Sequence, residues 1–213
     1  DGMQALGYPI AGPGNDLSPG HRRYNFVWYA AYDDAALEDM LTDRDGIRHE
    51  VSIKPPLIRE DVLAAMDAFA KSHLSGPLLE VLSVGERPFF TPIYDHCAPR
   101  FAAGRVALAG DAACVARPHV GMGVTKAAGD ALALADCLSE HGGVGAVPDA
   151  LRAYSNVRVP VARAAHQRAQ MLGRYVFDDA GGARNANGRH HPHLKDVLAL
   201  TAVDCSPEAV PAT

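Results

Sequence analysis

The sequence lacks the apolar run that a membrane helix requires, since no stretch approaches the roughly 20 residues of such a span. It also lacks an excess of positive charge: 25 acidic residues outnumber 20 basic ones, which argues against a nucleic-acid partner. The chain opens on Asp1 without a basic start or an apolar stretch, so no signal peptide is expected. Hydrophobic residues at 48% and charged residues at 21% are typical of a soluble globular protein.

The cysteines are too far apart to form a CxxC pair. Reduced thiols in a cytoplasmic protein are the simplest interpretation of that spacing. The four cysteines are Cys97, Cys114, Cys137 and Cys205.

A cluster of imidazoles near the end of the chain is the one candidate for metal binding. His190, His191 and His193 are residues of a type that binds metals well. They lie in a Gly- and Asn-rich segment with no carboxylate at useful spacing. A surface histidine cluster is therefore favoured, and no metal is predicted.

Hydrophobic periodicity predicts both strands and helices. Tyr24, Phe26 and Trp28 alternate on one face, which predicts a strand over residues 22–29. The predicted helices cover residues 34–41, 59–74, 75–82, 122–140 and 148–177, and further strands cover residues 88–94 and 105–109.

The two predicted C-terminal helices differ in their expected burial. The arginines of the helix over residues 148–177 do not share one face, so this helix is predicted to be solvated and to kink at Pro160. The helix over residues 122–140 is predicted to pack through one apolar face. That face consists of Val124, Ala127, Ala131, Leu134, Ala135 and Leu138.

The stretch over residues 104–138 contains the residues most suited to binding a ligand. A buried strand would deliver Asp111 at its carboxyl end, where open α/β sheets bind ligands. The Asp111 carboxylate can accept hydrogen bonds from two neighbouring hydroxyls, as a ribose or ribityl chain would offer. Ala112 and Ala113 leave room for a ligand to lie against the backbone.

The loop after this strand is rich in Pro and Gly. Pro118 stiffens it, and Gly121 and Gly123 expose backbone N–H groups at a helix N-terminus, which favours partial negative charge. A flavin fits this description because its N1–C2=O2 edge becomes negative on reduction. The alternative left open is a strand–turn–helix in which Asp111 only caps and the glycines only allow a turn.

This string resembles the second flavin-binding motif of the FAD-dependent aromatic-ring hydroxylases. The matching pieces are Gly110-Asp111-Ala112-Ala113, Pro118, Gly121, Gly123 and Asp130-Ala131. In that family the aspartate binds the ribityl region and the Pro/Gly loop lies beside the isoalloxazine ring. The resemblance implies an FAD-binding set of Gly110, Asp111, Ala112, Pro118, Gly121, Met122, Gly123 and Val124.

Two residues of the same loop are candidates for substrate binding. The resemblance places Arg117 and His119 near the flavin ring, where they could meet an ionised oxygen of the substrate, and a structural role is the alternative for each. Cys114 stands where many relatives carry His, and Thr125 where many carry Asn, so no substrate analogy with phenol hydroxylases is drawn. No catalytic residue is assigned.

The resemblance extends to the subgroup that hydroxylates dihydroxypyridines. It implies an FAD-dependent monooxygenase in which NADH or NADPH is the electron donor and O2 supplies the oxygen inserted into a small aromatic or heteroaromatic ring. Neither a membrane nor a nucleic acid is an expected partner, and a homodimer is left open. The pieces that carry this likeness are residues 23–29, 41–43, 46–48 and 116–119.

The family's GxGxxG loop, which holds the FAD pyrophosphate, is missing from the sequence. Residues 121–126 read only GxGxxK, and Gly12-Pro13-Gly14 has no helix after it. We therefore expect the C-terminal half of such an enzyme. The alternatives are a non-catalytic flavin-site remnant or interaction module, and a flavin reductase on the same fold that does not use O2.

The fold class expected from this resemblance is α/β, in the broad sense that includes α+β. Residues 1–100 would form part of a substrate-binding domain with an antiparallel sheet. Residues 101–145 would supply the C-terminal strand and helix of a Rossmann-like FAD-binding domain, and residues 146–213 a C-terminal helix and a loose tail.

Overall fold

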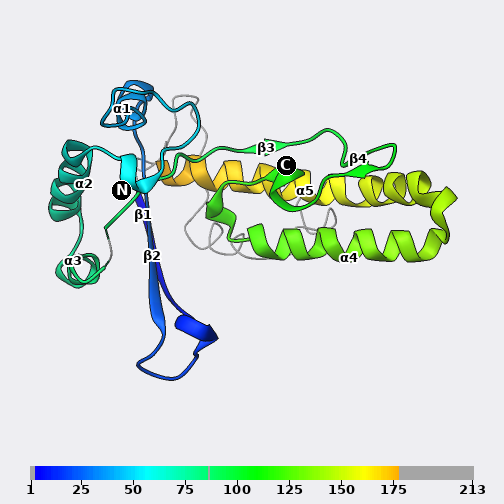
Figure 1. Cartoon of the computed structure of the whole chain (residues 1–213), viewed down its shortest axis with the longest axis horizontal. Coiled ribbons are helices and arrows are strands. Elements are labelled where there is room, and N and C mark those ends of the chain that lie inside the picture. The colour runs from blue at the N-terminus through cyan, green and yellow to red at the C-terminus, as the bar shows by residue number, and fades with distance from the viewer. Residues whose placement is uncertain (1–2, 86, 178–213) are drawn as a thin grey trace. The chain divides into compact units, whose positions relative to one another are not determined.

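The chain divides into two compact units, residues 2–92 and residues 93–213. The computed structural model describes residues 3–85 and 87–177, so Cys205 and the histidine cluster at 190–193 lie outside the described residues. The structure is a mixed α/β fold of long helices and small antiparallel sheets (Figure 1). The domain boundaries expected at residues 100 and 145 stay a prediction.

The first unit begins with a two-stranded antiparallel ribbon. Strands β1 (Met3–Ile10) and β2 (Arg23–Ala30) pair in a register that sets Met3 opposite Ala30 and Ile10 opposite Arg23. The strand predicted over residues 22–29 is therefore confirmed. Its Trp28 stacks on Phe69 with ring centroids 5.1 Å apart, which joins the ribbon to a helix of the same unit.

Three helices follow the ribbon, close to their predicted positions. They are α1 (Asp34–Met40), α2 (Glu60–His73) and α3 (Gly76–Ser83). Helix α1 begins where Asp33 accepts a 2.7 Å hydrogen bond from the Ala36 N–H, as an N-cap should. The core of this unit consists of Met40, Leu41, Ile53, Ile58 and Val62.

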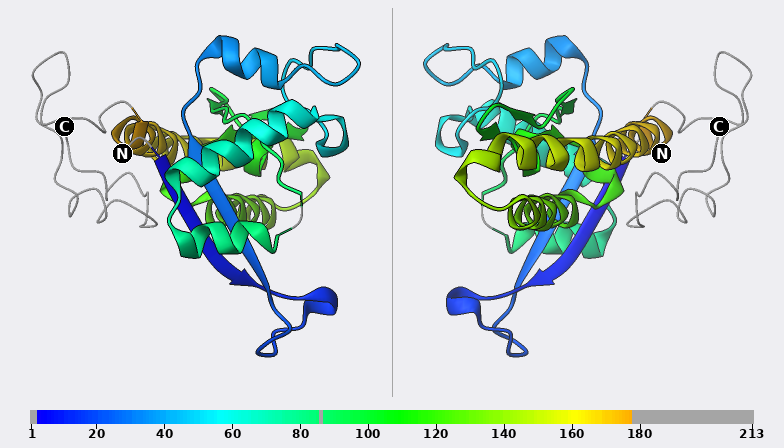
Figure 2. Two further views of the ribbon diagram at one scale, coloured as in Figure 1. Left: turned by 90° about the vertical axis from the view of Figure 1, so that its left-hand side faces the viewer. Right: turned by 90° about the vertical axis from the view of Figure 1, so that its right-hand side faces the viewer.

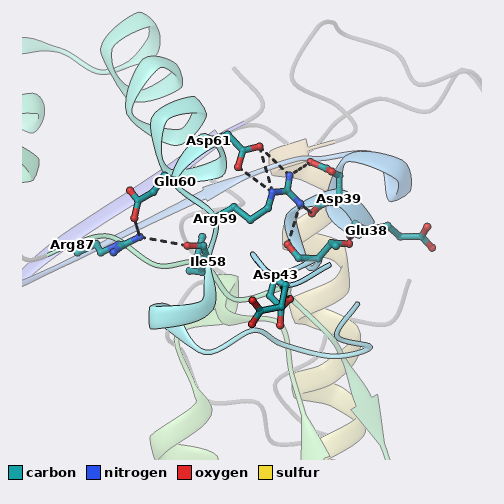
Figure 3. Close-up of polar contacts among 10 residues, drawn as sticks. Glu38, Asp39, Asp43, Ile58, Arg59, Glu60, Asp61 and Arg87 are labelled. Carbon is teal, nitrogen blue, oxygen red and sulfur yellow. Dashed lines mark hydrogen bonds and ion pairs between the residues drawn. The ribbon is translucent and has the colours of Figure 1, made fainter. Parts of the chain in front are cut away.

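Arg59 connects the start of α2 to the end of α1 (Figure 3). Its Nη1 donates to the carbonyl oxygens of Asp39 at 2.8 Å and Thr42 at 3.0 Å. Its Nη2 donates to the Asp39 carboxylate at 2.8 Å, and its Nε to Asp61 at 3.0 Å. The side chain therefore adds a donor to the Asp39 carbonyl, which also accepts from the Thr42 N–H at 3.0 Å, and supplies one to the Thr42 carbonyl just beyond the helix end.

The second unit is built on two long helices. Helices α4 (Gly123–His141) and α5 (Val147–Phe177) lie side by side and are joined by a short turn (Figures 1 and 2). The predicted helix over residues 148–177 is confirmed, and it runs through Pro160 without ending. No helix among the described residues is long and apolar enough to cross a membrane.

Two small sheets and three short turns lie along these helices. Strand β3 (His96–Cys97) pairs with β6 (Cys114–Val115), and β4 (Ala102–Ala103) pairs with β5 (Val106–Ala107). The buried side chains between the sheets and helices include Phe101, Ala113, Cys114, Tyr154 and Ala162. The 3-10 turns are η3 (Gly110–Ala112), η4 (Pro118–Val120) and η5 (Val144–Ala146).

The strand predicted over residues 88–94 is wrong, because that described segment contains no strand. Pro88 and Pro92 have no backbone N–H and break a hydrogen-bond ladder at two positions. The aromatic content of the segment suggested a strand, but the prolines decide its structure.

The buried strand predicted over residues 105–109 is also wrong in length and burial. It is reduced to β5, and Val106 keeps 66% of its surface exposed. An apolar run of this kind is typical of a strand with neighbours on both sides. Within the described residues β5 pairs with β4 alone.

The predicted apolar face of α4 is mostly exposed. The buried positions are Lys126, Asp130 and Cys137, whereas Val124 is 86% exposed. The sequence pattern assigned the charged positions of α4 to solvent. In the structure Lys126 and Asp130 are buried because they pair with each other and Asp130 pairs with Arg158. Helix α5 is likewise not simply solvated, since Arg168 is buried against its neighbours.

We predict that Arg59→Met lowers the free energy of unfolding by about 1–2 kcal/mol, because the Thr42 carbonyl loses the donor that Arg59 supplies and the Asp39 carbonyl keeps only its backbone donor. Urea unfolding followed by Trp28 fluorescence reports on this unit, since Trp28 is the protein's single tryptophan. Asp61→Asn is the matched control and should change stability far less, because exposed ion pairs contribute little. Equal losses in both variants would contradict this account.

Candidate functional site

The segment that leads to Asp111 is held by buried side chains of α5. The Tyr154 hydroxyl donates to the Leu108 carbonyl at 2.8 Å, and the Phe101 N–H donates to Ser155 Oγ at 2.9 Å. Tyr154 has no exposed surface, and burial raises its pKa to about 12. The neutral phenol therefore acts as a permanent donor that fixes the backbone two residues before Gly110.

Gly110 is bound at both its backbone groups by side chains of α4. Its N–H donates to Asp130 Oδ2 at 2.9 Å, and its carbonyl accepts from Lys126 Nζ at 2.8 Å. Lys126 Nζ is also 3.2 Å from Asp130 Oδ2, and Arg158 Nε of α5 donates to Asp130 Oδ1 at 2.8 Å. We call these three residues, Lys126, Asp130 and Arg158, the Gly110 clamp.

The sequence offered weak signals for this clamp. Lys126 and Asp130 are four residues apart on a helix, a spacing more typical of a surface ion pair. The second signal is a glycine, Gly129, inside a predicted helix. The structure explains it, because a Cβ there would lie 3.0 Å from the Arg158 guanidinium. Arg158 itself is 28 residues from Asp130, and no local pattern connects them.

Asp111 follows the clamped glycine and is exposed. Within the part of the chain that the structure describes, its carboxylate has no hydrogen bond or ion pair. Ala112 is also exposed, while Ala113 is buried and its carbonyl accepts from the Ala98 N–H at 3.0 Å. The turn therefore presents a carboxylate to solvent from a backbone that is fixed on both sides.

Cys114 is a buried thiol and does not extend the exposed part of the site. It stands opposite Cys97 in the β3–β6 pair, and its S–H donates to the Ala162 carbonyl at 3.7 Å. Burial, followed by the neighbouring Cys97 thiol, raises the pKa of Cys114 to about 12. It therefore stays protonated and unreactive at neutral pH.

The loop before α4 has the backbone geometry that its glycines suggest. Gly121 adopts φ +68°, a left-handed conformation that favours glycine, and its N–H donates to the Pro118 carbonyl at 2.9 Å. Pro118 is exposed, Met122 is partly buried, and α4 begins at Gly123 with no side-chain cap. Backbone N–H groups of the first turn therefore remain available to an acceptor.

The N-terminus of α4 and the Asp111 turn are close together. The Gly110 carbonyl is bound by Lys126, and a Cβ on Gly110 would lie 3.5 Å from that of Ala127. The structure thus brings the Gly110–Ala112 turn against α4, the helix that begins at Gly123.

Arg117 and His119 both point toward α5. Arg117 Nε donates to Asp95, and His119 packs edge-on against Phe177 with ring centroids 5.2 Å apart. Burial, followed by the Arg117 charge, lowers the pKa of His119, so its ring is neutral at pH 7. Their predicted contact with a substrate stays a prediction.

Three polar side chains lie close to the Asp95 carboxylate: Arg117, Gln170 and His166. Gln170 Nε2 donates to it at 3.3 Å, and His166 Nε2 lies 3.7 Å away. Burial alone would raise the pKa of Asp95, but the hydrogen bond and charge of Arg117 outweigh burial and lower it. Asp95 is therefore ionised and anchors Arg117 at neutral pH.

Among the described residues, no group of three or more His, Cys, Asp or Glu side chains is arranged to hold a metal ion. The polar groups that converge at the Asp111 turn are a carboxylate and backbone N–H groups. Such a combination suits a neutral ligand with hydroxyls and a polarised carbonyl edge.

Two family models match the chain and define its class. "FAD binding domain-like" matches residues 1–95 and "FAD binding domain" matches residues 89–169. The chain belongs to the FAD-binding monooxygenase family. The predicted resemblance to FAD-dependent aromatic-ring hydroxylases is confirmed, together with its dihydroxypyridine subgroup.

Individual relatives are consistent with this class. The chain is 33% identical over 142 residues to 2,6-dihydroxypyridine 3-monooxygenase of Paenarthrobacter nicotinovorans, covering 66% of this chain and 35% of the relative. It is 38% identical over 81 residues to 3-amino-4-hydroxybenzoate 2-monooxygenase of Streptomyces cremeus, covering 38% of this chain and 20% of the relative.

Solved structures share the fold. The structure of 2,6-dihydroxypyridine-3-hydroxylase from Arthrobacter nicotinovorans matches with a TM-score of 0.72 and 25% identity, covering 91% of this chain and 46% of that chain. PqsL of Pseudomonas aeruginosa, a probable FAD-dependent monooxygenase, matches with a TM-score of 0.54 and 24% identity over 84% of this chain and 43% of its own. The chain spans about a third of the length of 2,6-dihydroxypyridine 3-monooxygenase and about half of the matched structures.

We predict that Gly173→Ala lowers the free energy of unfolding by about 1–2 kcal/mol, although alanine gains about 1 kcal/mol in helix propensity. A Cβ at Gly173 would lie 3.0 Å from His119 Cδ2 and 3.3 Å from Arg117 Cδ, and both side chains are held in place by other contacts. Thermal or urea unfolding measures the change.

Gly76→Ala is the matched control, because a Cβ there meets nothing within 4 Å and should be tolerated. An increase in the stability of Gly173→Ala equal to that of the control would show that His119 and Arg117 move aside without cost.

Proposed function

We propose that this chain forms one wall of an FAD site in a monooxygenase. The enzyme would hydroxylate an electron-rich aromatic or hydroxypyridine ring with NADH or NADPH and O2. The single observation that carries this proposal is the exposed Asp111 carboxylate, which follows a clamped glycine beside the uncapped N-terminus of α4. Homology to FAD-dependent aromatic monooxygenases supports it.

The residues of the turn fit the sugar-like part of a flavin. The Asp111 carboxylate can accept hydrogen bonds from two ribityl hydroxyls, and its exposure leaves both oxygens free to do so. Gly110 and Ala112 carry little or no side chain, so a ligand can approach their backbone. Charge-assisted hydrogen bonds of this kind can hold the uncharged ribityl chain without any net attraction of charge.

The loop and first turn of α4 fit the ring of a flavin. Backbone N–H groups at Gly123 and Val124 in the first turn of α4, together with the helix dipole, favour partial negative charge at the ring's pyrimidine edge, and the Gly121–Met122 backbone leads into that turn. Pro118 limits the conformations of the loop that would lie beside the ring. When bound, FAD would supply the redox and oxygen-transfer chemistry, while the chain binds and orients it and keeps water away.

The substrate class proposed here rests on the relatives. Their names describe enzymes that act on a dihydroxypyridine and on an aminohydroxybenzoate, both electron-rich rings. We propose a ring of that kind, with Arg117 and His119 as candidates to contact its ionised oxygen. The free thiols Cys97, Cys114 and Cys137 agree with the cytoplasmic location that is part of the proposal.

Asp111→Ala is predicted to weaken FAD binding about 10- to 100-fold, since a hydrogen bond to a charged group contributes about 1.5–3 kcal/mol. The measurement is a titration with FAD of the full-length protein, in which this chain is joined to the segment that carries the GxGxxG loop, followed by quenching of flavin fluorescence. Asp136→Ala is the matched control, because Asp136 is exposed on α4 away from the turn.

Equal affinity in the two variants would contradict the assignment of Asp111. A wild-type protein that binds no flavin would contradict the proposed function and favour a non-catalytic remnant. Oxidation of NADH or NADPH that depends on the ring compound but gives no oxygenated product would favour a flavin reductase.

A further inference from the structure

The Gly110 clamp buries three ionisable side chains around one backbone turn. Asp130 has no exposed surface, and the side chains of Lys126 and Arg158 are 3% and 12% exposed. Burying such groups is costly, and well-packed apolar residues are often as stable or more stable in their place. Stability alone therefore gives no reason for α4 to carry Lys126 and Asp130 here.

The contacts of the clamp suggest what it does. Asp130 binds the N–H of Gly110 and Lys126 binds its carbonyl, so both polar groups of one residue are fixed from the same helix. Gly110 has φ +59°, a left-handed conformation that favours glycine, and its carbonyl also accepts from the Ala113 N–H at 3.1 Å. Fixing Gly110 also fixes the direction in which the next residue, Asp111, leaves the turn.

Arg158 completes the arrangement from α5. It donates to Asp130 Oδ1 and, at 3.3 Å, to the Lys126 carbonyl, so it orients the carboxylate that holds the Gly110 N–H. Its guanidinium occupies the space beside Gly129 that any larger residue would fill. The clamp therefore depends on both α4 and α5. It also depends on Gly129, which makes room for the Arg158 guanidinium.

The charges of the clamp also complement Asp111. Two cations face one anion behind the turn, and the Asp111 carboxylate lies on the exposed side of it.

We propose that Lys126, Asp130 and Arg158 are positioning residues for flavin binding, which act through Gly110 to direct the Asp111 carboxylate toward the ribityl hydroxyls. This inference rests on the proposed function and deepens it. The clamp touches no ligand itself, so its effect on affinity must pass through Asp111.

A double-mutant cycle on FAD affinity tests that dependence. Lys126→Met keeps most of the unbranched stem of the side chain and leaves Asp130 paired with Arg158. It removes the Lys126 donor to the Gly110 carbonyl, which keeps the Ala113 N–H at 3.1 Å. We expect it to weaken FAD binding roughly 10-fold, in line with the loss of one charged hydrogen bond. Combined with Asp111→Asn, it should weaken binding by less than about twofold beyond Asp111→Asn alone.

Gly129→Ala is a second variant that leaves every ionisable group of the clamp in place. Its Cβ would displace the Arg158 guanidinium by a few tenths of an ångström, while alanine favours the helix. We expect the same dependence on Asp111, with a smaller loss of affinity and a folded protein. This variant decides the matter if Lys126→Met does not fold, as measured by circular dichroism and thermal unfolding.

The outcomes separate the two proposals. If wild type binds FAD but the losses in the double variants multiply, or the clamp variants bind as wild type does, the positioning role is overturned and the flavin site stands. If wild type binds no FAD, the proposed function fails, and the positioning role fails with it.

Discussion

The second unit depends on the interaction of Asp130 with three donors: the Gly110 N–H, Lys126 and Arg158. This buried carboxylate connects α4 to α5 and both helices to the turn before Asp111. A lone buried carboxylate would be unstable, so its donors must stay in place and must be brought there by long helices. The close approach of α4 and α5 at Asp130 and Arg158 meets that requirement.

Other polar side chains of α5 also bind backbone groups of the segment before the turn. Tyr154 and Ser155 bind the backbone of Leu108 and Phe101, so a short strand pair with little burial of its own is fixed by a helix. The exposed apolar surface of Val106 and Val124 shows that the described unit does not cover every apolar side chain it carries. Polar contacts therefore hold the turn in place. The candidate site depends on the direction in which the Asp111 side chain leaves this turn as well as on which residues are present.

The sequence predicts the elements better than their burial. Periodicity located β2 and α2 because each carries a regular apolar pattern. It placed α4 correctly but not its buried face, because hydrophobicity treats Lys126 and Asp130 as solvent-facing and cannot see Arg158 across 28 residues.

The order of residues along one stretch was enough to predict the turn and loop of the candidate site. The clamp beneath them is a tertiary arrangement, and neither Lys126 nor Arg158 belongs to the recognised motif. Whether Asp111 in fact meets the flavin is tested most directly by a structure of the protein with FAD bound. We expect Asp111 carboxylate oxygens within about 2.5–3.0 Å of ribityl hydroxyls, with the Gly110 clamp unchanged. A flavin bound elsewhere, or an Asp111 carboxylate turned away from it, would contradict the account.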